Sequence, residues 1–462
     1  MVNDVQSQLN STRVLKIATP RSPDELRRVM WEATSAGGVV SIAGGRHSMG
    51  GQQFGARTVL IDTRGLDRVL DFDRERGWVT VEGGIQWPAL LEFLGRAQPS
   101  GSGSWGIHQK QSGADRLTLA GALSCNAHGR GLTLPPIAGQ VERFDLLTPS
   151  GETLTCSRTE RPELFALAIG GYGLFGIFTQ ITLRLRPRVK VRRSVCITGV
   201  ASLMDQMAGR IQDGFEYGDF QFAIEPNDPG FLERGVLSCY EPVPNHTPLT
   251  PDPVHFSEQD WLDLAVAAHR DKKLAFRRYA DTYLRTSGQV YWSDAQLSGP
   301  YLDGYHEHVD RVLGRRVRGT EMITELYVPR GRFADFMGHV RRLLRERQAD
   351  VVYGTVRLIE RDEDTFLAWA REPWACVVLN LHVDHTEKGI ASSAETFRRL
   401  IDVAILHGGS YYLTYHRWAR RDQVEACHPR MKAFLEAKLR YDPHERIQSE
   451  WYRWHTRLLG LR

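Results

Sequence analysis

The sequence predicts an α+β fold of two successive regions that meet near Pro187. In the first region, short apolar runs alternate with helical patterns, and the loops between them are rich in glycine. After Pro187, longer strand-like runs are separated by amphipathic helices, which is typical of an α+β domain with a largely antiparallel sheet. The connection over residues 98–131 is unusually long for a compact domain and therefore indicates a functional segment.

The first region opens with a polar stretch, residues 1–12, which we expect to be frayed. A helix is expected over residues 25–36, because Ser22 can cap it and Pro23 fits its first turn. Apolar and β-branched runs predict the strands that follow, with two further amphipathic helices between them. The expected strands are residues 38–42, 58–62, 69–73, 78–82, 141–148, 152–156 and 177–185, and the further helices are residues 87–94 and 162–169.

In the second region, apolar residues repeat every two residues in some segments, which predicts strands, and about every 3.6 residues in others, which predicts helices. Residues 408–418 fit either a strand or a loop. The expected strands are residues 191–200, 221–224, 236–240, 321–328, 351–359 and 376–383, and the expected helical segments are residues 258–282, 303–312, 332–347, 393–406 and 429–438.

The balance of charge and the cysteine pattern argue against several classes of protein. The formal charge of +4 comes from 59 basic and 55 acidic residues spread along the chain, which argues against a dedicated nucleic-acid surface. The six cysteines are scattered without a CxxC pair, so we expect free thiols and no bound metal. Because no apolar run reaches membrane-spanning length and no signal-peptide core is present, we expect a cytoplasmic protein without an integral membrane segment.

Residues 41–51 surround Arg46, His47 and Ser48 with glycines and follow a predicted strand. Glycine allows the backbone to approach a ligand closely, so successive N–H groups can converge on a phosphate. The imidazole of His47 would then lie beside the bound group. The alternative is a tight surface turn in which the histidine is incidental.

Four glycine-containing motifs follow one another along the first region. They are Ala43-Gly44-Gly45-Arg46-His47-Ser48, Thr80-Val81-Glu82-Gly83-Gly84, the segment Leu119–Gly131 and the segment Gly171–Thr179. In this order and spacing they resemble the FAD-linked oxidoreductases of the vanillyl-alcohol oxidase type, which share the p-cresol methylhydroxylase-type (PCMH-type) fold. Within that family the sequence is most similar to the branch of the alditol and aldonolactone oxidases.

The resemblance implies a PCMH-type FAD-binding domain of two subdomains over residues 13–187, completed by the C-terminal segment 430–462. It also implies an α+β cap domain over residues 188–429. In the alditol and aldonolactone branch, a histidine before serine in the glycine loop is joined covalently to the flavin, which implies covalent FAD on His47. The alternative is a His47 that only hydrogen-bonds a noncovalent cofactor. The implied cofactor-binding residues are Ala43, Gly44, Gly45, Arg46, His47, Ser48, Gly113, Thr118, Gly121, Ser124, Ala127, His128, Gly129, Gly176 and Ile177.

Catalytic residues are also implied, in the cap and near the C-terminus. Glu325 matches the substrate-binding glutamate of the alditol branch, and Arg357 matches a neighbouring arginine. The alternative is a structural Glu–Arg pair that supports the sheet. The family's His-Trp-Gly-Lys run is missing here, and Tyr415, His416 or Arg417 is expected to take the role of its lysine. This departure leaves the exact substrate open.

From these features we expect an enzyme that uses FAD to oxidise a hydroxyl group of a polyol, sugar or lactone by hydride transfer to flavin N5. Its partners would be a small-molecule alcohol or sugar substrate and oxygen or another electron acceptor. One alternative is a noncovalent flavoenzyme that oxidises a glycosyl carbon as part of an epimerisation. A second alternative is a flavin-free binding protein that has kept the fold.

Overall fold

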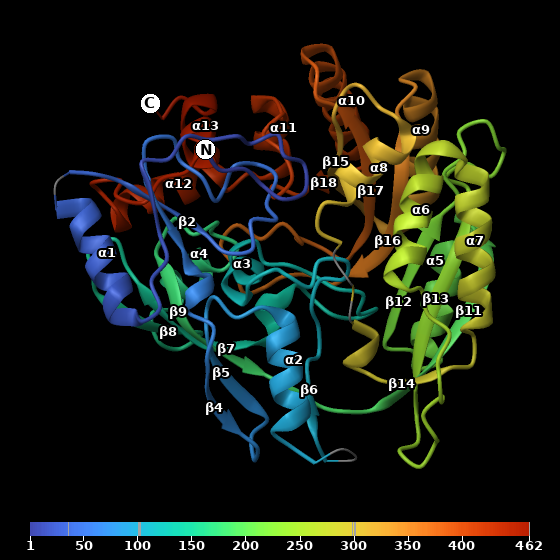
Figure 1. The fold of residues 1–462 in the computed structure, drawn as a ribbon, viewed down its shortest axis with the longest axis horizontal. Helices are drawn as coiled ribbons and strands as arrows, with labels where there is room; N and C mark the ends of the chain where they lie inside the picture. Colours follow the sequence, from blue (N-terminus) through green and yellow to red (C-terminus); the bar gives the residue numbers. More distant parts are fainter. Residues whose placement is uncertain (36, 100–102, 298, 300–301, 462) are drawn as a thin grey trace.

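The computed structural model describes residues 1–35, 37–99, 103–297, 299 and 302–461. Residue 36 of the expected first helix, residues 100–102 of the long loop and residue 462 of the C-terminal segment therefore lie outside the described residues. Figure 1 shows the N-terminal half, blue to green, beside a second half that contains the largest sheet. The fold is α+β, as the sequence predicts, and its two larger sheets are antiparallel.

Two sheets form most of the N-terminal half. The described strands of the smaller sheet are parallel in the order β1-β3-β2, and those of the larger are antiparallel in the order β4-β5-β9-β7-β8. The hydroxyl of Ser22 accepts a hydrogen bond from the Glu25 N–H (3.2 Å), which confirms the predicted cap of the first helix. The strands are β1 (Lys16–Ala18), β2 (Val40–Ala43), β3 (Val59–Asp62), β4 (Val69–Asp73), β5 (Trp78–Glu82), β6 (Trp105–Gly106), β7 (Val141–Leu147), β8 (Thr153–Ser157), β9 (Ile177–Arg184) and β10 (Arg186–Pro187), and the helices are α1 (Pro23–Ser35), α2 (Trp87–Arg96), α3 (Leu119–Ser124) and α4 (Pro162–Ala168).

The second half is built on an antiparallel sheet whose described strands run in the order β14-β11-β13-β12-β16-β17-β15-β18. Its strands are β11 (Lys190–Gly199), β12 (Tyr217–Phe222), β13 (Arg234–Val243), β14 (Val290–Trp292), β15 (Gly319–Pro329), β16 (Val351–Ile359), β17 (Trp374–Asp384) and β18 (Ser410–Tyr411). The helices after β11 are α5 (Val200–Gln212), α6 (Glu258–Arg270), α7 (Lys272–Arg285), α8 (Tyr305–Leu313), α9 (Phe333–Glu346), α10 (Glu387–Leu406), α11 (Arg421–Cys427), α12 (Met431–Tyr441) and α13 (Glu450–Leu458).

Helices cover both faces of this large sheet. Helices α5, α9 and α10 pack together on one face, and α6, α7 and α8 pack together on the other (Figure 1). Strand register brings Gln221, Thr355, Val378 and Glu325 into one row across β12, β16, β17 and β15. Because successive side chains of a strand point to opposite faces, these four side chains share one face. Three residues of that row, Gln221, Val378 and Glu325, line the cavity described below.

The expectation of a frayed N-terminal segment over residues 1–12 is wrong, because most of its side chains are buried or partly buried. The carboxylate of Asp4 accepts hydrogen bonds from the backbone N–H groups of Gln6, Ser7 and Gln8. The carbonyl of Ser7 in turn accepts a hydrogen bond from Thr320 Oγ1 on β15 (2.7 Å). Polar side chains here turn inward to satisfy backbone groups, which composition alone does not reveal.

The C-terminal segment returns to the N-terminal half. Ile447 forms a parallel bridge with Val40, and Glu450 N–H donates to the carbonyl of Phe54 (2.7 Å). Figure 1 shows the red helices α12 and α13 beside the N-terminus. The domain boundaries at residues 187 and 429 stay a prediction.

The structure also contains short helices that the sequence analysis does not predict. Helix α3 lies within the long glycine-rich connection, and α11 and α13 flank the last predicted helix. Each has at most nine residues, which is too short for a reliable period. No helix in the described part of the chain is both long and apolar enough to cross a membrane.

We predict that Asp4→Ala detaches the N-terminal segment. Three backbone N–H groups would lose their acceptor, which costs about 3 kcal/mol in total. The expected result is a lower apparent Tm and rapid proteolysis within residues 1–12. Asp4→Asn keeps one side-chain oxygen as an acceptor, so its Tm and its protease resistance should fall between those of the parent and those of Asp4→Ala. An Asp4→Ala variant as heat-stable and protease-resistant as the parent would contradict this account of the segment.

Candidate active site

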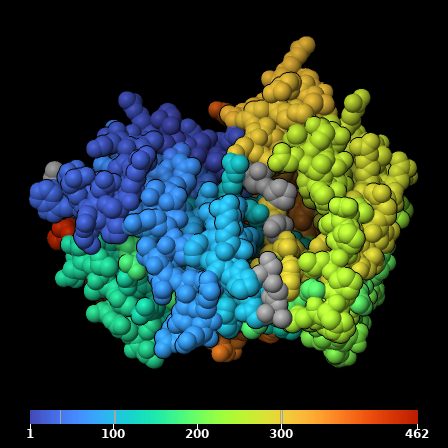
Figure 2. Space-filling model, turned by 60° about the horizontal axis from the view of Figure 1, so that its bottom comes forward, coloured from blue at the N-terminus to red at the C-terminus, as the bar shows by residue number. Residues whose placement is uncertain are grey.

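A cavity of about 500 Å³ lies between the two halves, within the size range of ligand sites. Its lining runs from the glycine loop and residues 111–128 of the N-terminal half to strands β12, β15, β16 and β17 of the large sheet. Figure 2 shows a hollow on the surface between the blue N-terminal half and the green and yellow segments of the second half.

Gly44 and Gly45 place the glycine loop directly against the segment before α3. An added Cβ at Gly44 would lie 2.1 Å from Thr118 Oγ1, and one at Gly45 would lie 2.3 Å from the carbonyl of Arg116. Only glycine allows such contact between the two segments. Arg46 has a φ of 62°, in the left-handed region that non-glycine residues rarely adopt. This loop therefore holds a conformation that strongly restricts its sequence.

Most of the predicted cofactor-binding residues lie together at this end of the cavity. Ala43 and Gly129 do not line the cavity. Ala43 is buried at the end of β2, where its carbonyl accepts from Thr63 Oγ1, and Gly129 lies against the backbone of Lys110. The predicted residues that line the cavity are Gly44, Gly45, Arg46, His47, Ser48, Gly113, Thr118, Gly121, Ser124, Ala127, His128, Gly176 and Ile177.

Glu325 is a buried carboxylate that faces the same cavity from β15. Its Oε1 lies 2.8 Å from His128 Nε2 and accepts the hydroxyl of Tyr327, and its Oε2 accepts the hydroxyl of Tyr415 (3.2 Å). The other ring nitrogen of His128 lies 3.2 Å from the carbonyl of Gly129. An ionised carboxylate can only accept hydrogen bonds, so Nε2 of His128 is the donor in its contact with Glu325.

The charge state of Glu325 follows from these partners. Burial raises the pKa of a carboxyl group, but the attraction of His128, the hydrogen bonds from His128 and Tyr327 and the charge of Arg357 outweigh it. The pKa of Glu325 is therefore lowered, and its carboxylate is ionised at neutral pH. The cavity thus contains a negatively charged hydrogen-bond acceptor on a buried side chain.

Arg357 faces the cavity from β16 and is 9% exposed. Among the described residues its Nε has no hydrogen-bond partner, and no ion pair joins it to Glu325. The alternative of a structural Glu325–Arg357 pair is therefore not formed. A buried guanidinium without hydrogen bonds is costly, so it is poised to bind a group that enters the cavity.

The C-terminal candidates separate into two groups. Tyr415 lines the cavity, whereas His416 and Arg417 do not. His416 points into the tail, where its ring stacks on Phe397 with centroids 4.9 Å apart. Arg417 points toward the N-terminal segment and donates to Asn10 Oδ1 (3.4 Å). The chain turns after β18, so neighbouring side chains point in different directions, and only Tyr415 remains a candidate for the active site.

Sequence reasoning missed a set of residues that line the cavity in the second half and beside it. Two of them could have been found from the sequence. Asp219 and Gln221 are two residues apart in a strand, so their side chains lie on the same face of the sheet. The others depend on contacts between distant segments. These missed residues are Gln6, Arg130, Asp219, Gln221, Tyr353, Asn380 and Tyr412.

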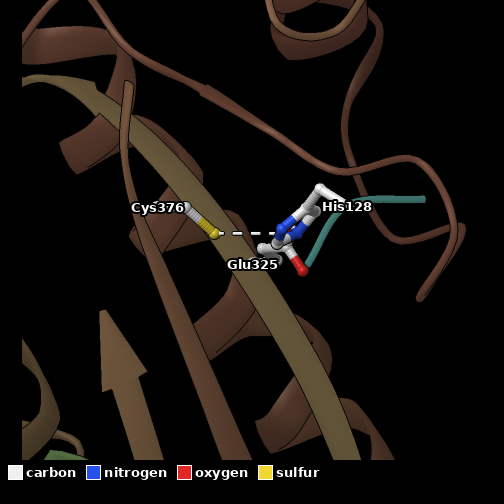
Figure 3. A group of neighbouring side chains, drawn as sticks. All are labelled: His128, Glu325 and Cys376. Carbon is white, nitrogen blue, oxygen red and sulfur yellow. Dashed lines mark hydrogen bonds and ion pairs between the residues drawn. The ribbon is translucent and has the colours of Figure 1, made fainter. Parts of the chain in front are cut away.

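Cys376 completes a group of three potential metal ligands with His128 and Glu325 (Figure 3). Its Sγ lies 4.0 Å from His128 Nε2. Burial, reinforced by the charge of Glu325, raises the pKa of Cys376 well above its ordinary value. The thiolate is the metal-binding form, so a protonated Cys376 fits a hydrogen-bonded network better than a metal site.

A second group of potential ligands, His269, Asp350 and His382, lies farther along the same sheet. The guanidinium of Arg315 lies 2.7 Å from His382 Nε2 and 3.3 Å from His269 Nδ1. A cation already interacts with these two rings, which disfavours a second positive charge there.

Comparison with known proteins gives a family model that matches one segment of the chain and several relatives of the chain. A family model described as an FAD binding domain matches residues 14–157. An L-gulono-1,4-lactone dehydrogenase of Mycobacterium tuberculosis is 25% identical over 449 residues, 96% of each chain. The mitochondrial L-galactono-1,4-lactone dehydrogenase of Arabidopsis thaliana is 33% identical over 312 residues, 61% of this chain and 48% of that protein. Cytokinin dehydrogenase 8 of Oryza sativa subsp. indica is 31% identical over 192 residues, 37% of this chain and 34% of that protein.

The residues at the glycine end fit an FAD molecule. Arg46 Nε and Ser112 Oγ are buried donors that have no hydrogen-bond partner among the described residues, and both side chains line the cavity. A diphosphate offers acceptors to donors of this kind. Gly44 and Gly45 also line the cavity, and their close contacts with Thr118 and Arg116 hold the loop in place beside these donors.

We predict that His416→Phe lessens the acid sensitivity of the fold. Burial lowers the pKa of His416 to about 3, whereas an unfolded chain binds this proton below about pH 6.5. Stability is therefore lost as pH falls from about 6.5 towards 3. Replacing the imidazole should reduce the loss of unfolding free energy between pH 7 and pH 5 by about 2 kcal/mol, as measured by urea unfolding. The exposed His246→Gln is the control, and a pH dependence identical to that of the parent would refute the prediction.

Proposed function

We propose that this chain, which is an FAD-dependent oxidoreductase with a PCMH-type FAD-binding domain, oxidises a hydroxyl-bearing carbon of an aldonolactone, sugar or polyol. The observation that carries the proposal is the ionised, buried carboxylate of Glu325 in the cavity that the glycine loop also lines. Bound FAD supplies the acceptor for the hydride that leaves the carbinol carbon.

Glu325 binds the substrate hydroxyl and takes its proton. Tyr415 and His128 hold the carboxylate in one orientation, because each approaches a different oxygen of Glu325. A fixed acceptor needs no reorganisation when the O–H bond breaks. The hydrogen bond from His128 stabilises the buried negative charge before the proton arrives. These contacts keep a carboxylate of lowered pKa ionised and oriented in the buried site.

Arg357 stabilises negative charge that develops on the substrate oxygen. Its guanidinium faces the cavity on β16, two strands from Glu325 in the sheet. A charged donor in a buried site interacts more strongly with an oxygen atom than the same donor does in water. Glu325 and Arg357 together therefore favour a substrate that presents oxygen atoms to both.

The substrate class is supported by the relatives. L-Gulono-1,4-lactone and L-galactono-1,4-lactone dehydrogenases are named for cyclic molecules that carry several hydroxyl groups. Such molecules offer donors to Glu325 and acceptors to Arg357 on the same ring. Oxygen or another acceptor would complete the cycle by reoxidising the cofactor.

In this proposal His47 would hold bound FAD by a covalent bond, which would replace a C–H bond of the flavin, with the proton released and the electron pair passed on to oxygen or another acceptor. The side chain lines the cavity from the glycine loop, and burial lowers its pKa to about 4. The imidazole is therefore neutral at physiological pH, with a lone pair available on one ring nitrogen.

We predict that His47→Ala releases the flavin on acid precipitation. In the parent protein the yellow colour should stay in the pellet, whereas in the variant it should appear in the supernatant. Flavin absorbance before precipitation, measured in both proteins, controls for loss of cofactor binding as such. Flavin found in the supernatant of the parent protein would show that the link is not covalent.

The function is tested by a screen of L-gulono-1,4-lactone, L-galactono-1,4-lactone, sorbitol, xylitol and glucose with the purified holoprotein. Turnover is followed both by oxygen consumption and by reduction of a dye. Turnover of at least one of these compounds is expected. A flavin that none of them reduces under anaerobic conditions would overturn the proposal.

We predict that Glu325→Gln lowers kcat/KM for the best substrate by about 100-fold or more, because the amide cannot take the proton. Flavin content, read from absorbance, should not change. In the parent protein kcat/KM should stay level as pH falls from neutral and drop only below the ordinary titration range of glutamate, because the pKa of Glu325 is lowered. Parent-like turnover by the variant would remove Glu325 from the reaction.

A further inference from the structure

Beyond Glu325 the cavity continues between the large sheet and helices α6 and α7. We name this part the distal slot and define it by Arg130, Asp219, Trp261, Tyr279, Tyr283 and Tyr353, all of which line the cavity. We propose that the distal slot binds a second sugar ring, so that the substrate is a glycoside of at least two units. The inference rests on the proposed function for the first ring and adds a subsite for the second.

The distal slot contains an ion pair between Arg130 and Asp219 in which both side chains keep polar atoms without a hydrogen bond. Arg130 NH1 lies 3.7 Å from Asp219 Oδ1, which is an ion pair but too long for a hydrogen bond. Both side chains are largely buried, and among the described residues Arg130 Nε and Asp219 Oδ1 have no hydrogen-bond partner. A buried donor and a buried acceptor left side by side each carry a cost that a suitable ligand can remove.

The chemistry of this couple selects a neutral hydroxyl group. An anionic ligand would be repelled by Asp219, and a cationic ligand by Arg130. A hydroxyl both donates and accepts hydrogen bonds, so it suits a slot lined by an acidic and a basic side chain together. Adjacent hydroxyls of a sugar offer both roles on one ring.

The opposite wall of the distal slot is aromatic. Tyr279 and Tyr283 of α7 stack with ring centroids 4.0 Å apart, and Trp261 of α6 also lines the slot. Tyr353 of β16 adds a further aromatic ring on the sheet side. The guanidinium of Arg193 lies 4.4 Å from the centroid of Tyr283, which holds that ring in place. A sugar ring has an apolar C–H face and a polar rim, so it suits a slot with an aromatic wall and a hydrogen-bonding floor.

The distal slot is too far from Glu325 for one ring to reach both. Asp219 lies on β12, and Glu325 lies on β15, with β16 and β17 between them. Three spacings between neighbouring strands amount to about 14 Å. A single pyranose that presents its reacting hydroxyl to Glu325 leaves the distal slot empty. A second ring in glycosidic linkage extends far enough to occupy it.

The test compares sorbitol with three of its glucosyl derivatives, maltitol, cellobiitol and isomaltitol, which differ in linkage. Dissociation constants are measured by calorimetry on holoprotein whose flavin has been reduced with dithionite, so that no turnover occurs. We expect at least one derivative to bind about tenfold more tightly than sorbitol. Saturation-transfer NMR should place both the sorbitol chain and the glucosyl ring of that derivative in contact with the protein.

Two variants localise the effect. Trp261→Ala and Asp219→Ala should each reduce the preference for the glucosyl derivative to about twofold or less. Trp261→Phe keeps an aromatic surface and should retain most of the preference, and Trp31→Ala, at an exposed tryptophan of α1, should retain all of it. A preference that survives both alanine variants would place the second ring elsewhere and overturn the proposal.

The two proposals fail in distinguishable ways. If sorbitol and lactones are oxidised and no glucosyl derivative binds more than about twofold more tightly, the distal slot is not a sugar subsite. If a derivative binds tightly and neither it nor any smaller compound reduces the flavin, the subsite stands and hydroxyl oxidation fails. If none of the four compounds binds, the distal-slot inference is wrong.

Discussion

The buried carboxylate of Glu325 is the constraint on which the site depends. An ionised group removed from water must be paired and hydrogen-bonded, and here the partners come from different parts of the chain. His128 follows α3 in the N-terminal half, and Tyr415 follows β18 near the C-terminus. Satisfying one charge therefore fixes the N-terminal half, the large sheet and the tail relative to one another. The same requirement creates a reactive group beside the cavity that the glycine loop lines.

The sequence accounts well for the end of the cavity that binds the cofactor. Gly44, Gly45 and the residues that follow α3 are recognised by the order and spacing of the glycine motifs. A position that tolerates no side chain leaves a direct trace in sequence, because only glycine can occupy it. The alternation of apolar residues likewise predicts most strands, since burial of one face imposes a period of two.

Features that depend on long-range contacts leave no such trace. Residues 1–12 are polar yet buried, because Asp4 binds their backbone. His416 is adjacent to Tyr415 but packs into the tail, because the chain turns after a two-residue strand. Arg130 and Asp219 meet across 89 positions of sequence, and only the tertiary fold shows that they form a couple. In our proposal substrate selection depends on Arg130 and Asp219, so the fold and cofactor are easier to predict than the substrate.

The central claim is that one continuous cavity holds the cofactor at the glycine loop and the reacting hydroxyl at Glu325. A crystal structure of the purified holoprotein tests this most directly. We predict density for FAD with its diphosphate against residues 44–48 and its ring system beside His47, His128 and Glu325. Density that places the ring system away from Glu325, or an FAD bound outside this cavity, would contradict the account.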